Sequence, residues 1–241
     1  MKSKETFTFS NAVLFAPLLA VLTIWTVFWV EVKFGLNFND FGIYPRRLSG
    51  LKGVLFSPFI HGSVEHLYNN TIPLAILTAF LFYFYRTAAI KVMFIGVILS
   101  GLLTWIIARP SYHIGASGLI YVLVSFIFFK GIFTRHYRLV ALSLVVVFIY
   151  GSMIWYIFPV KDGISWEGHL AGFLTGLLLA LFLKVQTPEI KKYEWEQEGY
   201  DEENDVFLQH FDENGNFIER KEEEEFREIQ INYHYKKSEE D

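Results

Sequence analysis

The chain has 241 residues, of which 53% are hydrophobic and 18% aromatic, with 25 Phe. This apolar content is more than a soluble domain of this length needs for its core, and it indicates a membrane protein. Residues up to Gln186 carry 14 Lys/Arg and 6 Asp/Glu and the rest carry 7 and 19, so that net charges of +8 and −12 sum to −4. No cysteine is present, which excludes disulfides, thiolate nucleophiles and zinc–thiolate sites.

Six charge-free apolar stretches have about the length that a hydrocarbon core of ~30 Å requires, and they predict six helical spans because lipid offers backbone groups no hydrogen-bond partner. They cover residues 12–30, 67–85, 92–108, 114–129, 139–160 and 168–183. The first stretch lacks a small-x-small cleavage site after it and precedes further spans, so we interpret it as a retained helix rather than a signal peptide.

The placement of Lys and Arg predicts the orientation. With the N-terminus inside, ten basic residues, Lys130 among them, fall in inner segments and six in outer ones, which favours both termini in the cytoplasm. We therefore expect an integral membrane protein of a bacterial inner membrane. The loop over 34–65 mixes turn formers with apolar pieces and is expected to rest partly in the interface.

Two regions of different character divide the chain. Residues 1–186 form the predicted membrane domain, and residues 187–241 form a soluble, cytoplasmic, acidic tail, which includes the run Glu222 to Glu225 and is expected to be partly disordered. Within the tail, Asn214-Gly215 is a hairpin signal that indicates a small hairpin over 206–220.

Polar residues inside spans are costly and mark function by default. Ser117 lies in Gly115-Ala116-Ser117-Gly118 at the start of the fourth span, where the glycines leave space and helix-start amides point toward any developing oxyanion. By itself this motif is weak, because a serine in a membrane helix more often bonds back to its own helix. The fourth span is also short, so its outer end must be sunk below the surface where water can reach it.

His169 is the only histidine well inside a C-terminal apolar span. Gly168, Gly172 and Gly176 recur every four residues around it and form a stripe that lets a neighbouring helix approach closely. Such a stripe is usually packing only, but beside a histidine it would bring an imidazole within reach of a serine on the facing helix.

A third polar group lies at the mouth of the second span, where His66 and Asn70 are four residues apart and share a helical face. Both side chains can donate hydrogen bonds, as an oxyanion hole requires, and the alternative is helix capping and interhelical hydrogen bonding. At ~1.5 Å per residue from the inner basic residues, Ser117, His169 and Asn70 lie at about 20, 22 and 24 Å. The three therefore fall at one level of the bilayer.

Together these motifs resemble the rhomboid family of intramembrane serine proteases over roughly residues 10–184. The resemblance implies an all-α membrane protein, a six-transmembrane-helix rhomboid-like bundle with a soluble C-terminal tail and a water-filled cavity open to the outer side. It implies a serine endopeptidase that cuts peptide bonds in or near transmembrane segments through a Ser/His dyad, with Ser117 as nucleophile and His169 as general base. His66, Asn70 and the Ser117 amide would bind the oxyanion.

The resemblance also implies supporting roles. Tyr121 would place an aromatic ring against the histidine, His61 would be structural, and Gly115, Gly118, Gly168 and Gly172 would give room. Many members carry a Trp-Arg pair in the first loop, where this chain offers Arg46 or Arg47 as a partial equivalent.

No metal or other cofactor is expected, because no ligand cluster has metal-site spacing outside the proposed oxyanion hole. The expected partners are transmembrane protein substrates and the lipid bilayer, without nucleic acid; the sequence does not give the oligomeric state. Two alternatives stay open: a non-catalytic rhomboid-like protein that binds membrane clients, which would typically lack the serine or histidine, and a small transporter or channel. The latter would be expected to carry ionisable groups along its spans, whereas Asp and Glu are absent from the six predicted ones.

Overall fold

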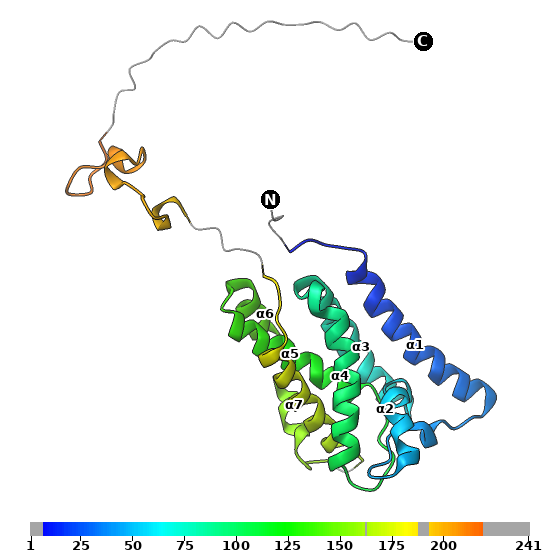
Figure 1. Ribbon diagram of the computed structural model, residues 1–241. Coiled ribbons are helices and arrows are strands. Elements are labelled where there is room, and N and C mark those ends of the chain that lie inside the picture. Colours follow the sequence, from blue (N-terminus) through cyan, green and yellow to red (C-terminus); the bar gives the residue numbers. More distant parts are fainter. Residues whose placement is uncertain (1–6, 162, 188–192, 219–241) are drawn as a thin grey trace, which may run out of the picture. The chain divides into compact units, whose positions relative to one another are not determined.

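The computed structural model describes residues 7–161, 163–187 and 193–218, and it divides the chain into two compact units, Met1–Ile190 and Lys191–Asp241. The first unit is a bundle of helices (Figure 1). Its helices are α1 (Ala12–Phe34), α2 (Gly53–Phe56), α3 (Val64–Phe84), α4 (Arg86–Ile107), α5 (Ser117–Thr134), α6 (Tyr137–Tyr150) and α7 (Trp166–Phe182).

Among the described residues, five helical segments are long and apolar enough to cross a membrane. They are α1, α3, α4, α5 and Tyr137–Ile157, which joins α6 to a 3-10 helix over Gly151–Ile157. The remaining apolar helix, α7, has 17 residues and rises only ~26 Å, so it is short for a core of ~30 Å. The six predicted apolar segments are thus helical, and five of them qualify as spans by length and composition.

Helices continue past the charge-free segments, and this corrects the predicted boundaries of the spans. α5 runs through Lys130, which the sequence placed in an inner segment directly after the predicted span. The buried ammonium group of Lys130 donates to the carbonyl of Ala180 at 2.9 Å. The six predicted stretches contain no Asp or Glu, but the helices extend beyond them, and α1 and α7 include the buried Glu31 and Glu167. Glu31 is tolerated because its carboxylate accepts the Phe38 N–H at 2.7 Å.

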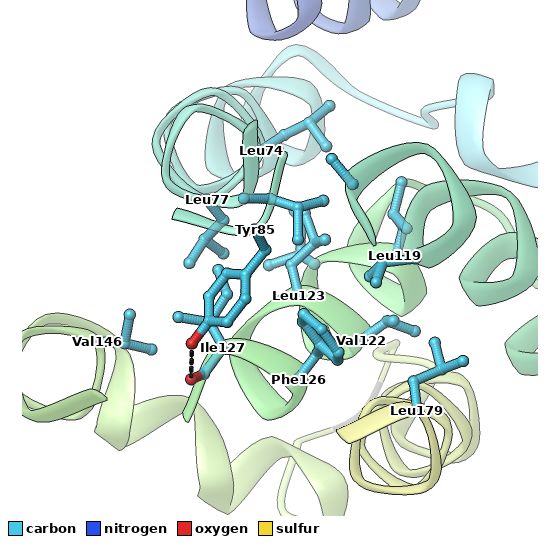
Figure 2. Packing of buried hydrophobic residues seen from close by; sticks show 14 of the residues in the cluster. Leu74, Leu77, Tyr85, Leu119, Val122, Leu123, Phe126, Ile127, Val146 and Leu179 are labelled. Atoms are coloured by element: carbon cyan, nitrogen blue, oxygen red, sulfur yellow. Dashed lines mark hydrogen bonds between the residues drawn. The ribbon is translucent and has the colours of Figure 1, made fainter. Parts of the chain in front are cut away.

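The core of the first unit surrounds α5, which packs against α3, α4, α6 and α7. Leu123, Phe126 and Ile127 of α5 are fully buried, and Tyr85 lies edge-on against Phe126. Figure 2 shows this cluster, including the hydroxyl of Tyr85, which donates to the Ile127 carbonyl at 3.4 Å. A helix buried on all sides can begin at a sunken end without exposing backbone groups to lipid.

Glycines set the distance between α5 and α7. A Cβ added at Gly172 would lie 2.2 Å from the Gly118 carbonyl oxygen, and one at Gly176 would lie 2.4 Å from the Val122 carbonyl oxygen. These glycines therefore allow the backbone-to-backbone approach that the stripe predicted. Gly168 differs, because an added Cβ there would meet the Ser165 hydroxyl of its own helix cap at 2.9 Å.

The loop between α1 and α3 is fixed to the end of α4. The Arg46 guanidinium donates to the carbonyls of Ile106 at 3.1 Å and Ala108 at 2.8 Å. Trp105 Nε1 donates to the Arg47 carbonyl at 2.9 Å. Of the two arginines that the sequence offered as an anchor, Arg46 makes the anchor with its side chain and Arg47 with its backbone.

The second unit has short 3-10 turns, including Glu202–Asn204 and Leu208–His210. Phe211 and Phe217 form an antiparallel bridge around a turn in which Asp212 accepts the backbone N–H groups of Asn214 and Asn216. This turn contains the predicted hairpin signal. Residues 219 and 220 of that hairpin, the acidic run Glu222 to Glu225 and much of the stretch predicted to be disordered lie outside the described residues.

Candidate active site

Ser117 is the first residue of α5, and the loop before it fixes its position. Gly115 has a φ of +106°, a conformation that favours glycine, and its N–H donates to the Ser57 carbonyl at 2.9 Å. The loop is thereby fixed to the segment that precedes α3. Since first-turn amides have no carbonyl partner within their helix, the Ser117 N–H is a free donor beside its own hydroxyl.

The imidazole of His169 lies between Ser117 and a backbone carbonyl. Its Nε2 is 3.0 Å from Ser117 Oγ, and its Nδ1 is 2.9 Å from the Tyr156 oxygen. A carbonyl oxygen can only accept, so in the neutral ring Nδ1 carries the proton and Nε2 keeps its lone pair toward the serine. The ring is buried, with 8% of the residue exposed. This arrangement is suited to removing the proton of the serine hydroxyl.

Tyr121 lies one turn after Ser117 and stacks on the His169 ring. The ring centroids are 4.3 Å apart with an interplanar angle of 13°. The Tyr121 hydroxyl donates to the Met153 carbonyl at 2.7 Å, which ties the tyrosine to the 3-10 helix that also supplies the Tyr156 carbonyl. The 3-10 helix therefore fixes the imidazole in two ways: the Tyr156 carbonyl bonds its edge, and the Met153 carbonyl holds the tyrosine that stacks on its face.

His66 and Asn70 lie against the loop that leads to Ser117. A Cβ added to Gly115 would be 2.5 Å from His66 Nε2 and 3.6 Å from Asn70 Nδ2, so both side chains reach the backbone two residues before the serine. Asn70 Nδ2 donates to the His66 carbonyl at 3.1 Å, which uses one of its two hydrogens. The second hydrogen remains available for a ligand oxygen. Ser63 caps this helix by accepting the His66 N–H at 3.1 Å.

His61 precedes α3 and is 2% exposed. Its Nδ1 lies 3.4 Å from the Phe59 oxygen, its Nε2 accepts the Ala116 N–H at 3.4 Å, and its ring is edge-on to His66 at 4.9 Å. The pKa of His61 is lowered to about 4, mainly by burial and next by the neighbouring His66. The hydrogen bond to the Phe59 carbonyl raises it by a smaller amount. His61 is therefore neutral at pH 7 and bonds the residue before Ser117 from the side.

A polar cluster that the sequence did not predict joins the loop before α5 to the start of α7. Arg109 donates its backbone N–H to Glu167 Oε1 at 3.2 Å, its guanidinium lies 3.6 Å from the same oxygen, and it also donates to the Ile164 carbonyl at 2.6 Å. Glu167 is two residues before His169 and 3% exposed. The cluster thus fixes the helix that carries the histidine.

A second link in this cluster runs through a histidine. His113 Nδ1 lies 2.6 Å from Ser165 Oγ and its Nε2 lies 3.0 Å from the Arg109 oxygen. Burial lowers the pKa of His113 below its ordinary value. Ser165 in turn caps α7 by accepting the Gly168 N–H at 3.3 Å. A serine three residues before Gly168 is a helix-capping pattern that the sequence contains. The contact between His113 and Ser165 joins residues 52 positions apart, and no local pattern indicates it.

A cavity of about 40 Å³ adjoins Ser117, with Ser57, Thr104, His113 and Ser165 on its wall. This volume suffices for a water molecule, and the polar groups on the wall can bind one. Among the described residues, no group of three or more His, Asp or Glu side chains could hold a metal ion.

Comparison with known proteins gives the family. The rhomboid domain matches residues 49–186, which contain every site residue named above. The chain belongs to the rhomboid family. It is similar to an uncharacterized protein of Mycobacterium bovis, with 36% identity over 185 residues that cover 71% of this chain and 74% of the relative. An uncharacterized protein of Mycobacterium leprae is 32% identical over 174 residues, 68% of each chain.

The matched residues include neither α1 nor the second unit. Because rhomboids include serine proteases, membership agrees with a serine and an imidazole in hydrogen-bond contact.

Proposed function

We propose that the protein is an intramembrane serine endopeptidase that hydrolyses peptide bonds in or near the transmembrane segments of other membrane proteins. The observation that carries the proposal is the 3.0 Å contact between Ser117 Oγ and His169 Nε2, with Nδ1 occupied by the Tyr156 carbonyl. A histidine that serves only to pack helices does not require this tautomer. It also does not require contact with a serine at the first turn of a helix, where backbone N–H groups are unpaired.

In the first half of the reaction, Ser117 Oγ attacks the carbonyl carbon of the scissile bond while its proton passes to His169 Nε2. The tetrahedral intermediate then collapses, the C–N bond breaks, and the amine leaves with the proton from His169. The acyl group stays on Ser117 as an ester. The Tyr156 carbonyl supports the imidazolium that forms transiently, which takes the place of the carboxylate in a three-residue triad.

The negative charge on the intermediate's oxygen needs donors. The Ser117 N–H lies in the first turn of α5, and Asn70 Nδ2 and His66 Nε2 lie beside Gly115, two residues before it. These three groups come from two helices and are held before substrate arrives. We propose them as the oxyanion hole.

In the second half, His169 removes a proton from water, the hydroxyl oxygen attacks the ester carbon, and Ser117 leaves with the proton returned. The small polar cavity next to Ser117 can supply that water. Glu167 and His113 do not contact the reacting atoms; they position α7 and the α5 loop.

The test is cleavage in proteoliposomes that contain the purified protein, with several single-span membrane proteins compared as substrates. Wild type is expected to release two fragments from at least one substrate, whereas Ser117→Ala and His169→Ala release none. Ser125→Ala is the matched control, because this serine lies on the same helix but donates to the Phe173 carbonyl at 2.7 Å, away from His169. Cleavage by Ser117→Ala at the wild-type rate would refute the proposal.

A further inference from the structure

A second cavity, far larger than the one beside Ser117, lies between α1, α3 and α4. Its volume is about 620 Å³, within the ~300–1,000 Å³ typical of ligand sites. All but two of its lining residues are apolar, and the two exceptions are threonines. The Oγ1 of Thr23 is already bonded to the Leu19 carbonyl at 2.7 Å. An apolar cavity of this size is unsuited to water, since it offers too few polar partners.

The cavity has a deep floor and a rim that faces the bilayer. Ile24, Leu74 and Ala116 on the floor are 1–2% exposed, whereas Leu19 and Phe94 on the rim are each 68% exposed. Helix α1 packs on α3 at the edge of the bundle (Figure 1), and Leu55 and Phe56 of α2 line the cavity together with Ala116, the residue before Ser117. Because the rim lies on helices that cross the membrane, lipid chains have direct access to the floor.

The other end of the cavity lies near a basic residue. Arg86, Ile90 and Phe94 are spaced four residues apart on α4, so they lie on one face, and Ile90 and Phe94 line the cavity. Arg86 is exposed at the first turn of α4 and has no hydrogen-bond or ion-pair partner among the described residues. A guanidinium group in that position suits a phosphate.

We propose that this cavity binds one acyl chain of a phospholipid whose phosphate lies against the Arg86 guanidinium. The chain enters between α1 and α4 from the leaflet at the turn that joins α3 to α4, and it runs toward the loop that covers the far end. From Arg86 to Val97 the helix rises ~16 Å, which gives the chain an extended apolar path. This binding site is independent of the proposed protease activity.

The acyl-chain site shares a wall with the cavity beside Ser117. Pro58, Val97 and Leu119 line both. A bound chain therefore supports the partition between the bilayer and that small polar cavity. If the proposed function is correct, loss of the lipid slows the reaction of Ser117, but the binding itself is measured without any activity.

The test is native mass spectrometry of the detergent-purified full chain, equilibrated with phosphatidylglycerol that carries two 16-carbon chains. Wild type is expected to retain one lipid at collision energies that remove the rest. Ala20→Phe fills the cavity from α1 and is expected to lower the bound fraction about tenfold. Ala141→Phe, an exposed α6 position outside the cavity, is the matched control and should retain the lipid.

The phosphate contact is tested separately by Arg86→Gln, with Lys91→Gln as control because Lys91 is exposed on another face of α4. Arg86→Gln should weaken phosphatidylglycerol retention and Lys91→Gln should not. Size-exclusion chromatography and circular dichroism establish that each variant is folded. Equal lipid retention by wild type and a folded Ala20→Phe would overturn the acyl-chain site, and equal retention by Arg86→Gln would overturn the phosphate contact.

Discussion

Gly172→Ala is the substitution whose effect follows most directly from the packing of α5 on α7. The added Cβ would lie 2.2 Å from the Gly118 carbonyl oxygen and 2.9 Å from Tyr121 Cβ. Carbon and oxygen atoms of neighbouring helices approach to no less than ~3.3 Å, so the two backbones must separate by about 1 Å here. Neither contact is the end of a flexible side chain, and α7 itself must move.

The displacement reaches the proposed dyad because His169 lies three residues from Gly172 on the same side of α7. A separation of about 1 Å stretches the Ser117–His169 contact from 3.0 Å to ~4 Å, beyond hydrogen-bond length. Loss of positioned general-base catalysis lowers the rate by about 10²–10⁴. Overpacking also costs about 1–3 kcal/mol of stability, so the protein remains folded but melts at a lower temperature.

The assay is the second-order rate of labelling by a fluorophosphonate in detergent, measured beside the melting temperature. Gly151→Ala is the matched control, since its added Cβ would be 3.4 Å from a Val147 methyl group, an ordinary contact. Gly176→Ala would collide with the Val122 carbonyl at 2.4 Å but lies farther from His169, so it should lose similar stability and less labelling. A folded Gly172→Ala that labels within about twofold of wild type would refute the reasoning.

Three further predictions follow from other contacts. Asn70→Ala should retain the fold and lower the turnover of a cleaved substrate roughly a hundredfold, as expected for one oxyanion donor, and unchanged kinetics would remove Asn70 from the hole. Glu167→Ala leaves the backbone N–H of Arg109 without its acceptor and should lower the free energy of unfolding by about 1–3 kcal/mol, measured by thermal unfolding. Glu167→Gln keeps an acceptor oxygen at this position and should lose much less stability. Equal losses in the two variants would contradict this role. Because burial lowers the pKa of His61 to about 4 from 6.5 in the open chain, its contribution to stability is complete above pH 6.5 and declines by about 1.4 kcal/mol per pH unit as the pH falls toward 4. His61→Gln should therefore show a smaller loss of stability between pH 6.5 and pH 4 than wild type, and an equal loss would contradict the assignment.

The sequence predicted the parts of the structure that depend on hydrophobic length and on chain-local motifs. Ser117 at a helix start and His169 beside a glycine stripe could be placed at one depth from their distances to basic residues. Their separation of 3.0 Å could not be predicted, because it depends on how Gly172 packs against Gly118, and that register is set between helices.

Charged residues at helix ends explain where the predicted boundaries failed. Lys130 ends an apolar stretch in the sequence, but the helix continues because its ammonium group bonds the Ala180 carbonyl on α7. Glu31 is likewise accommodated by the Phe38 N–H. A hydropathy value reflects the charge of such a residue, but it does not reflect the hydrogen-bond partner elsewhere in the chain that compensates for burial of that charge. The same limit hid the pair of Arg109 and Glu167, which are 58 positions apart.

The measurement that tests the central claim most directly is mass-spectrometric mapping of the fluorophosphonate adduct on the wild-type protein in detergent. The geometry of α5 and α7 predicts a single adduct on Ser117 Oγ, lost in His169→Ala and retained in Ser125→Ala. An adduct on another residue, or undiminished modification of Ser117 in His169→Ala, would show that the imidazole does not activate this serine.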